Sequence, residues 1–83
     1  MNVEILKLQN KLAEAKRRFK DLDIRVSGLI ILVRGYLDPY EDDVTLLETQ
    51  KAQVEISNLH SAVEEMKELS VKIQKLQKDL GHE

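Results

Sequence analysis

The sequence contains no cysteine and no tryptophan, and it has only one proline, three glycines and two histidines among its 83 residues. Without cysteine the chain cannot form a disulfide, a zinc finger or a thiol-based catalytic site. Two histidines, His60 and His82, are too few for a histidine-rich metal site. We therefore expect neither a metal nor a cofactor. A chain of this size rarely buries enough apolar surface to be stable alone, so oligomerisation is the remaining means of stabilisation.

Long hydrophobic runs are also absent. The longest, Leu29 to Val33, is far shorter than the roughly 20 residues needed to span a bilayer. The N-terminal residues lack the basic start and apolar block of a secretory signal. The net charge of -2 provides no strong attraction to nucleic acids or anionic membranes. These features predict a soluble, cytoplasmic protein that binds no membrane.

A series of apolar residues at alternating steps of three and four dominates the first part of the chain. A repeat averaging 3.5 residues keeps one stripe of a helix against a partner helix, whereas a strand would alternate every second residue. The series predicts one long helix over about residues 2–36. Its members are Ile5, Leu8, Leu12, Ala15, Phe19, Leu22, Val26, Leu29, Val33 and Tyr36.

A turn over residues 37–44 is expected to follow this helix. Gly35 suits the left-handed conformation that closes many helices, and Pro39 disfavours a helical conformation at Asp38. The segment from Asp38 to Glu41 resembles a helix start, which predicts a short helical turn within the loop.

A second helix is predicted over about residues 45–80. Thr45 and Glu48 have the spacing of a capping box, and Gly81 is a suitable end. Four of its apolar residues recur every seven residues, at Leu59, Met66, Ile73 and Leu80. The apolar stripe shifts sideways near Met66. The shift predicts either local overwinding of a coiled coil or a stripe wide enough to contact more than one neighbour.

Two helices of similar length joined by a short loop favour an antiparallel hairpin. Facing residues would then have numbers summing to about 81, which places residues 16–18 near Glu64 and Glu65. Residues 1–37 carry eight basic and four acidic side chains, a balance of +4, and residues 38–65 carry one basic and eight acidic, a balance of -7. Such complementary halves suit a chain that folds back on itself. We expect residues 1–83 to form a single all-α helical-hairpin domain, resembling a coiled coil.

Helix one has more apolar surface than a single hairpin can bury. From Leu29 to Val33 it is apolar around its whole circumference, and Ile24 and Leu37 extend this patch, so Ile30, Ile31 or Leu32 would remain exposed. Such patches usually mark association surfaces, and a twofold dimer of hairpins forming a four-helix bundle would cover this one. Gly28, within the patch, indicates either close approach of another helix or a tolerated weak point. The predicted self-association residues are Phe19, Leu22, Val26, Leu29, Ile30, Ile31, Leu32 and Val33.

No spacing of nucleophile, base and acid typical of an active site is present, so we do not expect an enzyme. The prediction is a non-enzymatic module for assembly, scaffolding or adaptor interactions, acting as a homodimer or higher homo-oligomer or through a protein partner. The alternative is a small nucleic-acid-binding regulator, in which basic side chains contact phosphates. Its contact residues would be Lys16, Arg17, Arg18 and Lys20.

Two further clusters leave alternatives open. The basic residues 16–20 could instead pair with Glu64 and Glu65, and Phe19 is expected in the apolar stripe rather than free to stack on bases. The acidic turn Asp38–Asp43 could be a recognition tip for a basic partner or simply a set of helix caps.

Overall fold

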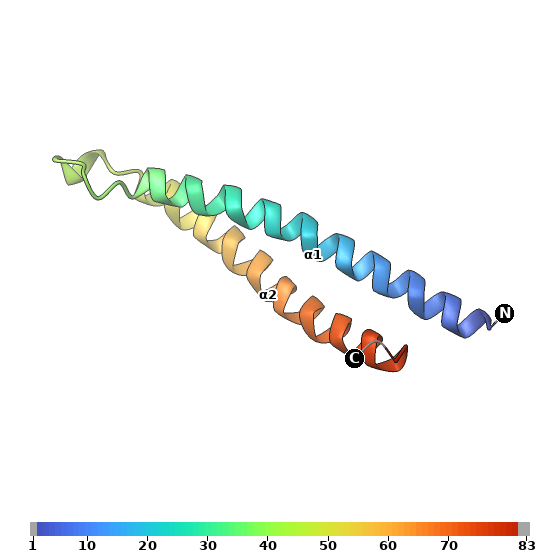
Figure 1. The fold of residues 1–83 in the computed structure, drawn as a ribbon. Coiled ribbons are helices and arrows are strands. Elements are labelled where there is room, and N and C mark those ends of the chain that lie inside the picture. Colours follow the sequence, from blue (N-terminus) through green and yellow to red (C-terminus); the bar gives the residue numbers. More distant parts are fainter. Residues whose placement is uncertain (1, 82–83) are drawn as a thin grey trace.

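The computed structural model describes residues 2–81 and shows two long antiparallel helices joined at one end (Figure 1). Helix α1 spans Val3–Tyr36 and helix α2 spans Thr49–Asp79, with the short 3₁₀ helix η1, Val44–Leu46, in the connection. The hairpin measures 65 × 19 × 14 Å. The described ends of the chain lie at the end of the hairpin opposite the turn. The predicted all-helical hairpin is thereby confirmed.

The predicted heptad stripe of α1 faces α2. We call the residues of both helices that lie between them the seam. On α1 every member of the series except the exposed Ile5 is buried or half-buried. Burial of such a stripe is the main force that keeps a helix of this length folded, because isolated helices are marginal in water. At the start of α1, the side-chain oxygen of Asn2 accepts a hydrogen bond of 2.9 Å from the backbone N–H of Glu4.

The α2 side of the seam follows an unbroken heptad series with the half-buried Val63 beside it, which favours the predicted wide stripe over local overwinding near Met66. Glu55 occupies the position that the apolar pattern assigned to Ile56; Glu55 is half-buried and Ile56 is exposed. A glutamate can fill such a site because its methylene stem covers apolar surface while its carboxylate reaches water. The apolar stripe is therefore wider than α1 covers. The α2 seam residues are Ala52, Glu55, Leu59, Ala62, Met66, Leu69, Ile73, Leu76 and Leu80.

Helix α2 begins at Thr49 rather than at residue 45, and the predicted capping box is wrong. Asp43 already uses Thr45: its Oδ1 accepts hydrogen bonds from the backbone N–H of Thr45 at 3.0 Å and from the hydroxyl of Thr45 at 2.6 Å. Asp43 thus caps η1, and the extended Leu47, with φ -67° and ψ 134°, separates η1 from α2. The short turn expected at Asp38–Glu41 is present, closed by a hydrogen bond of 3.3 Å from the backbone N–H of Glu41 to the carbonyl of Asp38, and η1 adds a second turn at Val44–Leu46.

The glycines at the helix ends behave differently from one another. Gly35 lies inside α1 and has no positive φ, so the prediction that it closes the helix in a left-handed conformation is wrong. The helix still ends at Tyr36, where the backbone N–H of Leu37 donates to the carbonyl of Val33 at 3.0 Å. Gly81 has a φ of 75° directly after Leu80, the C-terminal cap of α2, which confirms its predicted role as the terminating residue.

Candidate interaction surface

A bidentate ion pair joins the two helices near their middle. Nε of Arg18 donates to Oε2 of Glu65 at 2.6 Å, and Nη2 donates to Oε1 at 3.0 Å. The hydrogen bond and the charge of Glu65 raise the pKa of Arg18, and the hydrogen bond from Arg18 is the largest cause that lowers the pKa of Glu65. The pair confirms that the basic cluster lies beside Glu65. Both side chains are about half exposed, so the pair contributes to register more than to stability.

The rest of the basic cluster stays in solvent. Lys16, Arg17 and Lys20 are exposed and form no ion pair with the residues that the structure describes. Phe19 is half-buried in the seam. The cluster therefore presents three unneutralised charges on α1 without a free aromatic ring.

The predicted self-association residues fall into two groups. Leu22 and Leu29 are buried in the seam against α2, and Phe19, Val26 and Val33 are half-buried there. Ile30, Ile31 and Leu32 are 42%, 70% and 45% exposed. Because consecutive helical residues are about 100° apart, Ile30 and Leu32 flank the seam on opposite sides and Ile31 points away from α2. The three residues therefore cannot all meet one partner helix.

Ile31 belongs to a second heptad series on the side of α1 opposite the seam. Ile24, seven residues earlier, shares its direction and is 65% exposed. Gly28 and Gly35 complete the series at steps of four, three and four. A Cβ atom placed on either glycine would meet nothing within 4 Å. We call Ile24, Gly28, Ile31 and Gly35 the outer face.

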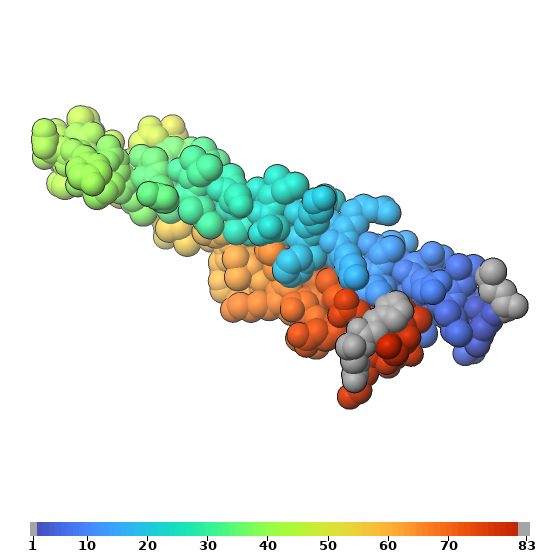
Figure 2. All heavy atoms as spheres, viewed as in Figure 1, coloured from blue at the N-terminus to red at the C-terminus, as the bar shows by residue number. Residues whose placement is uncertain are grey.

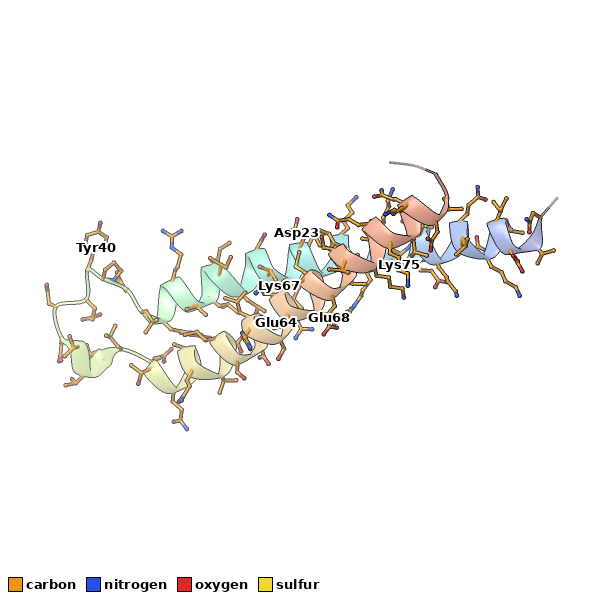
Figure 3. The ribbon with its side chains drawn as sticks, turned by 90° about the horizontal axis from the view of Figure 1, so that it is seen from below. Asp23, Tyr40, Glu64, Lys67, Glu68 and Lys75 are labelled. Atoms are coloured by element: carbon orange, nitrogen blue, oxygen red, sulfur yellow. The ribbon has the colours of Figure 1, made fainter. Side chains whose placement is uncertain are left out.

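An open hollow lies where the outer face meets the turn. Its volume is about 640 Å³, and its lining includes Ile31, Gly35, Leu37, Pro39 and Tyr40. In Figure 2 the green part of α1 lies at the surface up to the turn. Tyr40 is 89% exposed and projects from the turn in Figure 3. The end of the hairpin therefore presents an apolar concavity.

The acidic turn is held by its own side chains. The carboxylates of Asp38, Glu41 and Asp43 accept hydrogen bonds from the backbone N–H groups of Tyr40, Asp43 and Thr45 at 2.9, 3.1 and 3.0 Å. The hydrogen bonds from Thr45 lower the pKa of Asp43. Asp42 makes no such bond within residues 2–81 and is exposed. Three of the four carboxylates thus act as caps, and the turn carries concentrated negative charge.

Two short-range ion pairs lie on α2 and at its N-terminal cap. Lys67 contacts Glu64 at 3.2 Å and Lys51 contacts Glu48 at 3.1 Å, each one helical turn apart; Figure 3 labels the first pair. His60 is exposed, and His82 lies outside the described residues. Over residues 2–81, no three histidine, aspartate or glutamate side chains converge where they could hold a metal ion.

Sequence reasoning located the exposed patch but missed its organisation. The signal was present in the sequence: Ile24 and Ile31 are seven residues apart, and so are Gly28 and Gly35. It was obscured because Leu29 to Val33 are all apolar, so the segment has no clear face until the seam residues are assigned to α2.

Comparison with known protein families, with characterised proteins and with solved structures finds no match to this chain. Neither α1 nor α2 has an apolar stretch long enough to cross a membrane, within the part of the chain that the structure describes.

Proposed function

We propose that the chain is a non-enzymatic, self-associating helical module that acts in assembly, as a scaffold or as an adaptor for other proteins. The observation that supports this proposal is the exposure of Ile24 and Ile31, 65% and 70%, on one face of a helix whose opposite face is already packed. Large apolar side chains aligned in this way favour association over solvation.

The simplest assembly is a dimer of two hairpins, in which four helices pack together as the sequence predicts. Fully burying an isoleucine contributes about 1.5–3 kcal/mol. Two such residues per chain form a small interface, so we expect a dissociation constant on the order of micromolar.

Sedimentation equilibrium over a wide concentration range tests the proposal. We expect the mass to rise from 9.6 kDa toward twice that value. Ile31→Glu should keep the chain monomeric, because dimerisation would bury an unpaired carboxylate. Val71→Glu is the matched control, since Val71 on α2 is 67% exposed and its substitution should leave the dimer intact. A wild-type chain that remains a monomer at high concentration would rule out self-association.

Nucleic-acid binding remains the second candidate because Lys16, Arg17 and Lys20 are exposed and without ion pairs in the described structure. Arg18 is already engaged by Glu65, which leaves fewer charges for phosphate. If the basic cluster binds RNA or DNA, affinity should fall steeply with salt. Replacing these three residues by glutamine should abolish binding while leaving the helical content of the hairpin unchanged, because all three are exposed.

A further inference from the structure

We propose that two copies of the chain dock through the outer face of α1, with their α1 helices antiparallel about a twofold axis between Gly28 and Ile31. This inference rests on the self-association proposed above and specifies its geometry. Three independent features of the chain favour it: the alternation of isoleucine and glycine, the hollow beside the turn, and the distribution of charge.

The outer face is complementary to itself in the antiparallel direction. When Ile31 lies level with Gly28 of the partner, Ile24 lies level with the partner's Gly35, because both pairs of numbers sum to 59. Each large side chain then faces a position without a Cβ, where a helix can approach closely. The same surface meets itself, as a twofold interface requires.

The hollow beside the turn has a place in this arrangement. Gly35 and Ile31 line it, and the register brings the partner's Ile24 level with Gly35. An isoleucine that is 65% exposed in the hairpin would therefore enter an apolar concavity. Its burial would recover the free energy that exposure to water costs.

Charge selects the antiparallel direction. In the same register Lys16 and Arg17 lie beyond the end of the partner's α1, on the side where the partner's acidic turn, with Asp42 and Asp43, follows Tyr36. Arg17 shares the outward direction of Ile24, seven residues later, and the turn continues beyond the end of α1 (Figure 1). Symmetry repeats these contacts at the other end of the interface. A parallel pair would instead place basic cluster beside basic cluster and acidic turn beside acidic turn.

Two like-charged pairs oppose this register: Arg25 lies level with the partner's Arg34, and Asp21 lies near the partner's Asp38, two residues after the end of its α1. Arg17 and Arg25, four residues before and after Asp21 on the same helix, offset the repulsion between the two aspartates. On the outer face itself the level pairs, Ile24 with Gly35 and Gly28 with Ile31, carry no charge.

The four helices would lie in a row, with the two α1 helices in the middle and each α2 on the outside. This is an open form of the four-helix assembly. In a closed bundle the contact would instead run through the flank of the hairpin, where Ile30 and Ile56 are exposed. The two forms therefore depend on different residues.

The substitution Gly28→Leu separates packing within the hairpin from packing between hairpins. Nothing in the hairpin lies within 4 Å of the added Cβ, and leucine favours a helix more than glycine does. We expect the monomer to melt at a higher temperature while the dimer dissociation constant rises at least tenfold. Ser57→Leu, an exposed site on α2, should leave the dimer unchanged. A Gly28→Leu dimer as tight as the wild type would overturn the inference.

Charge reversal tests the register. Arg17→Glu should weaken the dimer, and adding Asp42→Arg to the same chain should restore it, because both contacts are then reversed together. Asp42 suits this exchange because it caps no backbone group in the described structure. Failure of the double variant to recover affinity would contradict the proposed register.

Distances between spin labels measure the relative direction of the two α1 helices. Single cysteines can be labelled specifically because the chain has no cysteine of its own. Labels on Ser27→Cys should lie within about 20 Å of each other, and labels on Asn10→Cys about 60 Å apart, given a rise of 1.5 Å per residue. A parallel dimer would give short distances at both sites. If sedimentation shows no dimer, the proposed function fails. If a dimer forms with a short Asn10 distance, or is dissociated by Ile56→Glu and not by Gly28→Leu, the function stands and this geometry is wrong.

Discussion

Asp43 is the residue whose side chain most alters the path of the chain. Its carboxylate accepts hydrogen bonds from both the backbone N–H and the hydroxyl of Thr45. These bonds favour a 3₁₀ turn over a continuous helix, because short polar side chains offer the backbone an alternative partner. The start of α2 is thereby delayed to Thr49. One carboxylate thus accounts for the largest difference between the predicted and observed helix bounds.

The ion pair of Arg18 and Glu65 predicts an acid-dependent loss of stability. Arg18 lowers the pKa of Glu65 below its ordinary value of 4.5. Near this pH the folded state therefore binds fewer protons than the unfolded state. The stability from this carboxylate is fully present above about pH 4.5 and is lost as the pH falls through the lower value of the folded state. We expect the urea midpoint to stay level from pH 7 to 5 and to decline below 4.5.

The variant Glu65→Gln is the control for this pH dependence. It should lower the melting temperature at pH 7 by no more than a few degrees, because an exposed pair contributes little. It should also reduce the decline of the urea midpoint below pH 4.5. An identical acid profile for both proteins would exclude Glu65 as the titrating group.

At the scale of the element, α1 has two faces with different tasks. The seam face packs against α2, and its Leu22 is only 2% exposed. The outer face has no covering element in the described structure, and its glycines weaken the helix relative to alanine. A helix that served only the hairpin would gain from alanine at Gly28, since a Cβ there meets nothing.

Substitutions on the two faces should separate folding from association. Leu22→Ala removes a buried side chain and leaves a cavity, so we expect the free energy of unfolding to fall by about 2–5 kcal/mol. Ile24→Ala, two residues along on the outer face, should change the unfolding of the monomer little. Chemical denaturation at low protein concentration, followed by circular dichroism, measures both. Equal losses would show that the outer face packs within the hairpin.

The sequence predicted the helices well where periodicity determines packing, and poorly where local hydrogen bonds compete. The seam residues of α1 could be predicted because they form a heptad series, which any antiparallel partner helix would bury. Glu55 was missed because a pattern of apolar residues cannot represent a charged side chain whose methylenes are buried. The helical conformation of Gly35 was missed because glycine permits the left-handed conformation without requiring it. The outer face could be recognised only after the seam residues of α1 had been assigned.

At the scale of the whole molecule, the hairpin is long and thin, and its core is one layer of side chains. Within residues 2–81 no side chain is less than 2% exposed, and seven residues form the buried core. A molecule 65 Å long and 14 Å thick keeps most of its surface in water. Its stability should therefore depend on what covers the remaining apolar side chains.

We expect thermal stability to increase with protein concentration. A dimer that forms only from folded chains stabilises them by mass action, so the melting temperature should rise as the concentration passes the dissociation constant. Calorimetry from about 1 to 500 micromolar, a range set around the expected constant, measures the shift. Ile31→Glu should melt at one temperature throughout this range, and a concentration-independent wild type would argue against dimerisation.

The position of the chain ends has a mechanical consequence. The N-terminal end of α1 and the C-terminal end of α2 lie at the end of the rod opposite the turn (Figure 1). Cargo tethered to either terminus of one hairpin would therefore sit at the same pole, with the turn at the other. In an antiparallel pair these poles alternate, so two cargoes would be held apart at opposite ends. Such a pair would act as a molecular spacer rather than a clasp.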